Sequence, residues 1–154
     1  PNAEELANIA NNIADTVKNL GYKPRVAIIS YSNFGSFSRP SSLILNEAID
    51  ILNKRKVDFE FDGEMTPDIA LDYDLIKENY PFCKLSGPAN VLIMPDLRSA
   101  RISYKLLQKL GRGSMLGPLM IGGEKPFQIV QMGSSVSDIV NSASIAAYNV
   151  LYSN

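Results

Sequence analysis

The chain contains no histidine, and this absence excludes several kinds of chemistry. Among its 154 residues there are 0 histidines and a single cysteine, Cys83. Without an imidazole the chain cannot form a Ser-His or Cys-His pair, and most transition-metal sites lose their commonest ligand. A single cysteine cannot form a disulfide within the chain, which favours a cytoplasmic setting. Cys83 lies in a loop with aromatic residues and proline, where we expect a small buried residue rather than a nucleophile.

Long apolar runs and a strong net charge are also missing. No run approaches the ~20 apolar residues that span a bilayer, and no secretory leader is visible. A net charge of −1, from 15 basic and 16 acidic residues, provides no general attraction to nucleic acid or to a membrane surface. Any anion-binding feature must therefore be local. With 45% hydrophobic and 20% charged residues, the composition is typical of a soluble globular domain.

The spacing of apolar residues predicts alternating helices and strands. The expected helices are residues 4–20, 41–54, 97–110 and 136–151, with short helical pieces within 67–79. The expected strands are residues 26–31, 58–62, 91–94, 119–121 and 127–131. Strands that alternate with long helices imply an α/β fold, in which three αβα layers enclose a mainly parallel sheet. Ligands of such sheets bind beyond the carboxyl ends of the strands, so the loops at 30–38 and 95–99 matter most.

The first of these loops is rich in hydroxyl groups. It contains the candidate ligand-binding residues Ser30, Ser32, Asn33, Gly35 and Ser36. Hydroxyl and amide donors beside a glycine, followed by the start of a helix, suit a phosphate, a carboxylate or a thioester oxygen. The alternative is a serine-rich turn that caps the helix, and composition alone favours that reading.

A basic stripe and an acidic cluster are the other charged features. Spacings of three and four place five cations on one face of the helix expected at 97–110: Arg98, Arg101, Lys105, Lys109 and Arg112. They could bind the phosphates of an anionic ligand, although a solvated helix face is the more common origin of such a stripe. The acidic cluster is Asp62, Glu64 and Asp68. No phosphate loop or second carboxylate motif accompanies it, so we interpret it as a solvated turn and expect no metal site.

Five stretches resemble the phosphate acetyl/butyryltransferase family, in the version fused to the C-terminus of bacterial NADP-dependent malic enzymes. They are RVAIISYSNFGS (25–36), FDGEM (61–65), GPANVLIMPDLRSARISYKLLQK (87–109), LGPLMIGGEKP (116–126) and GSSVSDIVNSA (133–143). They occur in the family's order and cover nearly the whole chain. The assignment to the malic enzyme branch of the family rests mainly on Tyr31, Asn33 and Phe34.

The resemblance implies where ligands would bind and which catalytic groups have changed. It places the loop at 30–38 in the ligand cleft, Tyr104 and Lys105 near the substrate, and Lys109 where the family has an arginine. Active relatives carry a Ser-Arg pair before a glycine and an aspartate five residues after it. Gln131 and Met132 occupy the positions of that pair, and Asp138 is retained. A thioether cannot neutralise an oxyanion, and Asp138 is more simply a helix cap, so we expect no catalytic residue.

The resemblance also implies the organisation of the protein. Residues 1–113 correspond to the second lobe of a two-lobed module, and residues 114–154 to closing strands and a helix that pack on the first lobe. The preferred hypothesis is a regulatory and oligomerisation domain that senses acetyl-CoA. It would form a homodimer or higher oligomer within an enzyme that converts malate to pyruvate, with NADP and a divalent metal held by other domains. The alternatives are an active phosphate acetyltransferase and a dimerisation domain without a ligand.

Overall fold

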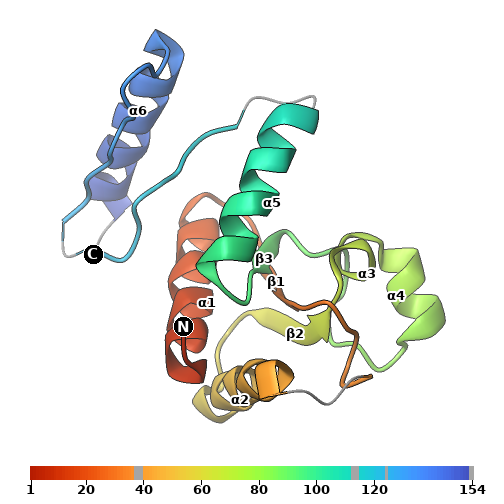
Figure 1. Ribbon diagram of the computed structural model, residues 1–154. Helices are drawn as coiled ribbons and strands as arrows, with labels where there is room; N and C mark the ends of the chain where they lie inside the picture. Colours follow the sequence, from red (N-terminus) through yellow and green to blue (C-terminus); the bar gives the residue numbers. More distant parts are fainter. Residues whose placement is uncertain (37–39, 112–114, 124, 153–154) are drawn as a thin grey trace. The chain divides into compact units, whose positions relative to one another are not determined.

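The computed structural model describes residues 1–36, 40–111, 115–123 and 125–152 (Figure 1). Its elements are α1 (Ala3–Asn19), β1 (Arg25–Ile29), α2 (Pro40–Arg55), β2 (Glu60–Met65), α3 (Pro67–Leu71), α4 (Tyr73–Asn79), β3 (Val91–Ile93), α5 (Leu97–Leu110) and α6 (Val136–Tyr152). The chain divides into two compact units, unit 1 (Pro1–Ser103) and unit 2 (Tyr104–Asn154). The predicted domain boundary after residue 113 falls outside the described residues and stays a prediction.

Unit 1 is built on one parallel sheet with the strand order β2-β1-β3. Side chains of β1 alternate between two cores, as the strand geometry requires. Val26 and Ile28 pack in a cluster with α1 and α2, whereas Ala27 and Ile29 pack in a cluster with α3 and α4. Helices therefore cover both faces of the sheet (Figure 1), and the predicted three-layer αβα fold with a parallel sheet is confirmed.

The carboxyl end of β2 departs from regular pairing. Ile28 pairs with Gly63, but Ile29 pairs with Met65, so the register leaves Glu64 without a partner in β1. Gly63 has a φ of +147°, and a Cβ at this position would lie 2.7 Å from the carbonyl oxygen of Ile28. Only glycine fits this backbone. The extra residue redirects the side chain that follows it, and Glu64 becomes fully buried at 0% exposure.

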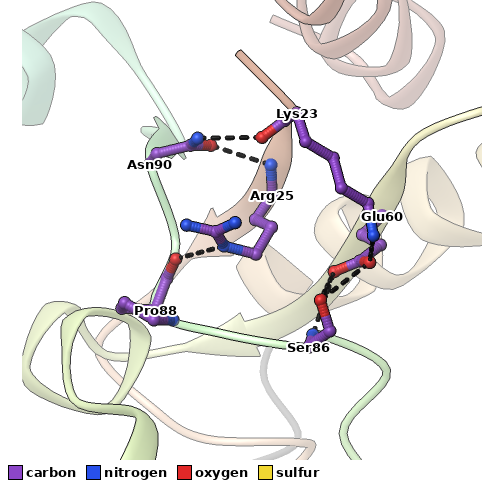
Figure 2. Close-up of polar contacts among 6 residues, drawn as sticks. All are labelled: Lys23, Arg25, Glu60, Ser86, Pro88 and Asn90. Atoms are coloured by element: carbon purple, nitrogen blue, oxygen red, sulfur yellow. Dashed lines mark hydrogen bonds and ion pairs between the residues drawn. The ribbon is translucent and has the colours of Figure 1, made fainter.

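A polar network fastens the opposite, amino end of the sheet (Figure 2). The Asn90 amide accepts a hydrogen bond from the Arg25 backbone N–H at 2.8 Å and donates one to the Lys23 carbonyl at 2.9 Å. Glu60 accepts hydrogen bonds from the backbone N–H and the hydroxyl of Ser86, and forms an ion pair with Lys23. This network holds the connection that precedes β3 against the starts of β1 and β2.

Replacing Asn90 with alanine is expected to destabilise the protein by about 1–3 kcal/mol, because two hydrogen bonds between segments are lost at about 0.5–1.5 kcal/mol each. The midpoint of urea unfolding measures the change. Asn79→Ala is the matched control, since the Asn79 amide donates only to the Leu75 carbonyl within its own helix. Equal midpoints for the two variants would contradict the role given to Asn90.

The strands predicted at residues 119–121 and 127–131 are wrong, because the described part of unit 2 contains no strand. The Gln128 side chain occupies the backbone groups that a ladder would need. Its amide accepts from the Met120 N–H at 2.9 Å and donates to the Met120 carbonyl at 3.0 Å. The predicted final helix is present as α6. None of the helices in the described parts of the chain combines the length and apolar character that a bilayer span requires.

Candidate functional site

The loop that follows β1, here called the β1 loop (residues 30–36), is fastened to the end of β2. The backbone N–H of Ser30 donates to the Met65 carbonyl at 2.9 Å, and that of Phe34 donates to the Glu64 carbonyl at 2.7 Å. The bulge in β2 brings these carbonyls within reach of the loop. The loop therefore has a defined shape at the carboxyl edge of the sheet, which is where a ligand is expected.

Glu64 provides a second connection, through its side chain. The Ser32 hydroxyl donates to Oε1 of Glu64 at 2.9 Å, and Ser32 is only 3% exposed. The other carboxyl oxygen, Oε2, is buried and has no hydrogen-bond partner. A buried polar atom without a partner is uncommon in a protein interior and calls for a physical explanation.

The interpretation of the acidic cluster as a solvated turn is therefore wrong for two of its three members. Asp62 is 8% exposed and Glu64 is 0% exposed. Asp62 is used inside the fold, since its carboxylate accepts the backbone N–H of Lys84 at 2.7 Å. No local pattern in the sequence indicates this burial, because it depends on the bulge. No group of side chains in the described residues is arranged to hold a metal ion.

Asn33 is held by its carbonyl oxygen. Oδ1 accepts from the backbone N–H of Thr66 at 2.7 Å and from the Thr66 hydroxyl at 3.1 Å. The hydroxyl of Ser36 donates to the backbone carbonyl of Asn33. The two bonds from Thr66 fix the orientation of the side-chain amide and leave Nδ2, its donor atom, out of the network. Gly35 completes the turn with a φ of +79°.

An aromatic cluster lies beside the β1 loop. The ring of Phe34, a residue with a φ of 48°, packs against Tyr80 and Phe82 with centroid distances of 4.9 Å each. Phe82 is 65% exposed. The nearby Cys83 packs against the core on the same face of the sheet, and its partial burial raises the pKa of the thiol to about 11. Little thiolate forms near neutral pH. Cys83 is half-buried rather than buried as expected, and its lack of a nucleophilic role stays a prediction.

Helix α5 carries the predicted basic residues on an exposed surface. Arg98, Arg101, Lys105 and Lys109 are all exposed, whereas Arg112 lies outside the described residues. Nζ of Lys105 lies 3.1 Å from Oε1 of Gln108. These side chains are therefore available to an anionic ligand. No contact in the described residues indicates which of the four cations would bind it. Their binding role stays a prediction.

Unit 2 contains a pocket of about 190 Å³. Its lining includes Tyr104, Gln131, Met132 and Asp138, so three positions that the resemblance assigned to catalysis lie around one hollow with the predicted substrate residue Tyr104. The Tyr104 hydroxyl donates to the Gly117 carbonyl at 3.0 Å. Among the described residues, no lysine or arginine belongs to this lining.

Asp138 is engaged in the cap of α6. Its carboxylate accepts the backbone N–H of Ser135 at 2.9 Å and the Ser135 hydroxyl at 2.8 Å, and the Asp138 N–H donates back to that hydroxyl at 3.2 Å. The reciprocal pair is the capping box that the sequence predicted. The bonds from the Ser135 hydroxyl and backbone lower the pKa of Asp138 below its ordinary value. A carboxylate held in this way is a weak base.

Comparison with known proteins identifies the family. A family model described as phosphate acetyl/butaryl transferase matches residues 1–147. The NADP-dependent malic enzyme of Rhizobium meliloti is 53% identical over 149 residues, which are 97% of this chain and 19% of that protein. The phosphate acetyltransferase of Treponema pallidum is 40% identical over 148 residues, which are 94% of this chain and 44% of that protein.

A solved structure extends the likeness to the fold. The phosphotransacetylase of Streptococcus pyogenes matches with a TM-score of 0.91 at 36% identity, over 98% of this chain and 46% of that one. The chain spans about a fifth of the malic enzymes that it matches, and less than half of the Treponema pallidum and Streptococcus pyogenes transferases. A family match over nearly the whole chain, supported by the shared fold, shows that the chain belongs to the phosphate acetyl/butaryl transferase family.

Proposed function

We propose that this chain is a regulatory and assembly domain that binds acetyl-CoA without transferring its acetyl group. The observation that carries the proposal is the pocket in unit 2, whose described lining contains Gln131 and Met132 but no cationic side chain. Acetyl transfer builds negative charge on the carbonyl oxygen, and losing one donor aimed at that charge typically costs about 10²–10³ in rate. The low pKa of Asp138 removes a second contribution, because a good general base has a pKa near the working pH.

The chemistry of the whole protein would then lie elsewhere in the polypeptide. Its malic enzyme relatives are about five times as long as this chain. We propose that the full protein is a cytoplasmic enzyme that oxidatively decarboxylates malate, and that its other domains hold NADP and the divalent metal. Acetyl-CoA could regulate that reaction only if its affinity differs between two states of the assembly.

Exposed apolar side chains support a role in assembly. Helix α5 has no buried residue, and its apolar members are largely exposed: Leu97 69%, Ile102 62%, Leu106 55%, Leu107 58% and Leu110 78%. Helix α6 is similar, with Val136 at 79% and Leu151 at 76%. Apolar surface of this kind marks contact with another part of the protein or a second copy. We propose that the protein is a homodimer or a higher oligomer.

An active phosphate acetyltransferase is the second candidate, and the 40% identity with the Treponema pallidum enzyme favours it. Two measurements on the full-length protein separate the candidates. Calorimetry with acetyl-CoA is expected to show saturable binding, and acetyl phosphate formation from acetyl-CoA and phosphate is expected to be absent or slower by about 10²–10³ than in a relative with the Ser-Arg pair. Comparable turnover would support the transferase. No binding would support a purely structural dimerisation domain.

A further inference from the structure

Ser142 in α6 has a buried hydroxyl that the protein itself does not use. A serine inside a helix usually bonds to a carbonyl one turn earlier or points to water. Ser144, two residues further along, follows this rule, because its hydroxyl donates to the Val140 carbonyl at 2.8 Å. Ser142 is only 9% exposed, and its hydroxyl has no hydrogen-bond partner among the described residues. A buried polar group without a partner calls for a physical explanation.

The position of Ser142 suggests that explanation, because its side chain lines the pocket of unit 2. Among the described lining residues, Ser142 alone is buried. Tyr104 also lines the pocket, but its hydroxyl proton is already donated to the Gly117 carbonyl. A donor that is shielded from water loses little hydration when a ligand arrives, so its hydrogen bond to the ligand contributes more. Ser142 therefore offers the pocket a buried donor.

The charges of the lining favour an acceptor that is itself uncharged. No lysine or arginine belongs to the described lining, whereas Asp138 does. Bonds from the Ser135 hydroxyl and backbone keep the pKa of Asp138 low, so it is a carboxylate at neutral pH. A phosphate would add negative charge beside this carboxylate with no cation in the described lining to offset it. The carbonyl oxygen of a thioester accepts a hydrogen bond without a charge, and apolar side chains such as Leu116 and Ile129 surround it suitably.

We propose that Ser142 is a ligand-binding residue of this pocket and that its hydroxyl donates a hydrogen bond to the carbonyl oxygen of an acyl thioester. The inference rests on the proposed function, because it places the acyl end of acetyl-CoA in the pocket of unit 2. It adds a contact that neither the basic residues of α5 nor Asp138 provides. One neutral hydrogen bond holds the acyl group without neutralising an oxyanion, which fits binding without transfer.

The test uses Ser142→Ala in the full-length protein and S-acetylpantetheine as the probe, because this compound carries the thioester and no phosphate. We expect calorimetry to show a Kd that rises about three- to tenfold, which corresponds to the loss of one neutral hydrogen bond. The Kd of acetyl-CoA should rise by the same factor. Ser144→Ala is the matched control on the same helix and should leave both values unchanged. An unchanged Kd in Ser142→Ala would overturn the inference and leave acetyl-CoA binding in place.

Urea unfolding of Ser142→Ala distinguishes a ligand contact from a structural role. The substitution removes no hydrogen bond within the described residues, and alanine is the better helix former. We therefore expect the midpoint of the variant to equal or exceed that of the wild type. A lower midpoint together with an unchanged Kd would assign the hydroxyl to the fold and refute its role in binding.

Two further outcomes separate this inference from the proposed function. Inorganic phosphate should not displace S-acetylpantetheine from the wild type, and displacement would show that the pocket recognises negative charge instead of the thioester. If the wild type binds S-acetylpantetheine with the expected loss in Ser142→Ala but does not bind acetyl-CoA, the role of Ser142 stands and the proposed function fails. A wild type that binds neither thioester would refute both.

Discussion

Replacing Gly63 with alanine is expected to destabilise the protein by about 2 to 6 kcal/mol. Two costs add in this variant. An L-residue at a φ of +147° occupies a backbone region open almost only to glycine, which costs about 1–3 kcal/mol. The new Cβ would also lie 2.7 Å from the Ile28 carbonyl oxygen, and overpacking of this kind costs about 1–3 kcal/mol more. Because Ile28 belongs to the central strand, the backbone has little room to relax.

Gly21→Ala is the matched control. Gly21 also has a positive φ, +85°, but nothing lies within 4 Å of a Cβ placed there. The Gly21→Ala variant therefore has the conformational cost without a steric clash, and we expect it to lose about 1 kcal/mol of unfolding free energy. Urea unfolding of the two variants compares the costs directly. If Gly63→Ala loses no more stability than Gly21→Ala, the bulge can relax and does not fix the position of Glu64.

The regular parts of the fold could be predicted because their patterns are local. The apolar spacing of residues 4–20 gave the first helix nearly to its observed bounds, Ala3–Asn19, and short apolar runs gave β1 and β3. The strand predicted at residues 58–62 is observed at Glu60–Met65. The prediction ended too early because Gly63 and Glu64 have the composition of a turn. Their place in the sheet depends on pairing with β1, which no local pattern reports.

The place of the β1 loop in the fold could be predicted, but the contacts of its side chains could not. The loop follows a parallel strand, so its position at the carboxyl edge of the sheet follows from the sequence, whereas its role as a binding site stays a prediction. The sequence could not indicate that the Ser32 hydroxyl is directed to a buried carboxyl, because its partner Glu64 is 32 residues away along the chain. The number of serines predicted several donors for a ligand. In the structure the hydroxyls of Ser32 and Ser36 donate within the protein, and the side-chain amide of Asn33 is oriented by Thr66. Burial and hydrogen-bond partners are tertiary properties, and they decide what a polar side chain offers to a ligand.

The pocket of unit 2 has no cation in its described lining, and two substitutions can supply one. Changing Gln131 to serine and Met132 to arginine together is expected to raise acetyl transfer from acetyl-CoA to phosphate by about 10²-fold or more in the full-length protein. The physical reason is that the described lining of the pocket has no cation, since one such donor typically contributes about 10²–10³ in rate. Met132 is fully exposed at 103%, so an arginine can be placed there without overpacking. Release of the free thiol of coenzyme A, followed with a thiol reagent, measures the rate.

Three further variants establish the origin of the gain. Met132→Gln adds a polar side chain of similar length without charge and should leave the rate unchanged. Met132→Lys adds a point charge without the two-pronged geometry of arginine, so it should recover only part of the increase. In the serine-arginine background, Asp138→Asn keeps an acceptor for the Ser135 N–H, so α6 should remain capped. Because the low pKa of Asp138 makes it a weak base, this change should lower the restored rate by less than tenfold. A larger loss would show that Asp138 takes part in proton transfer at the leaving sulfur of coenzyme A. Equal gains from glutamine and arginine would show that charge is not what limits the rate.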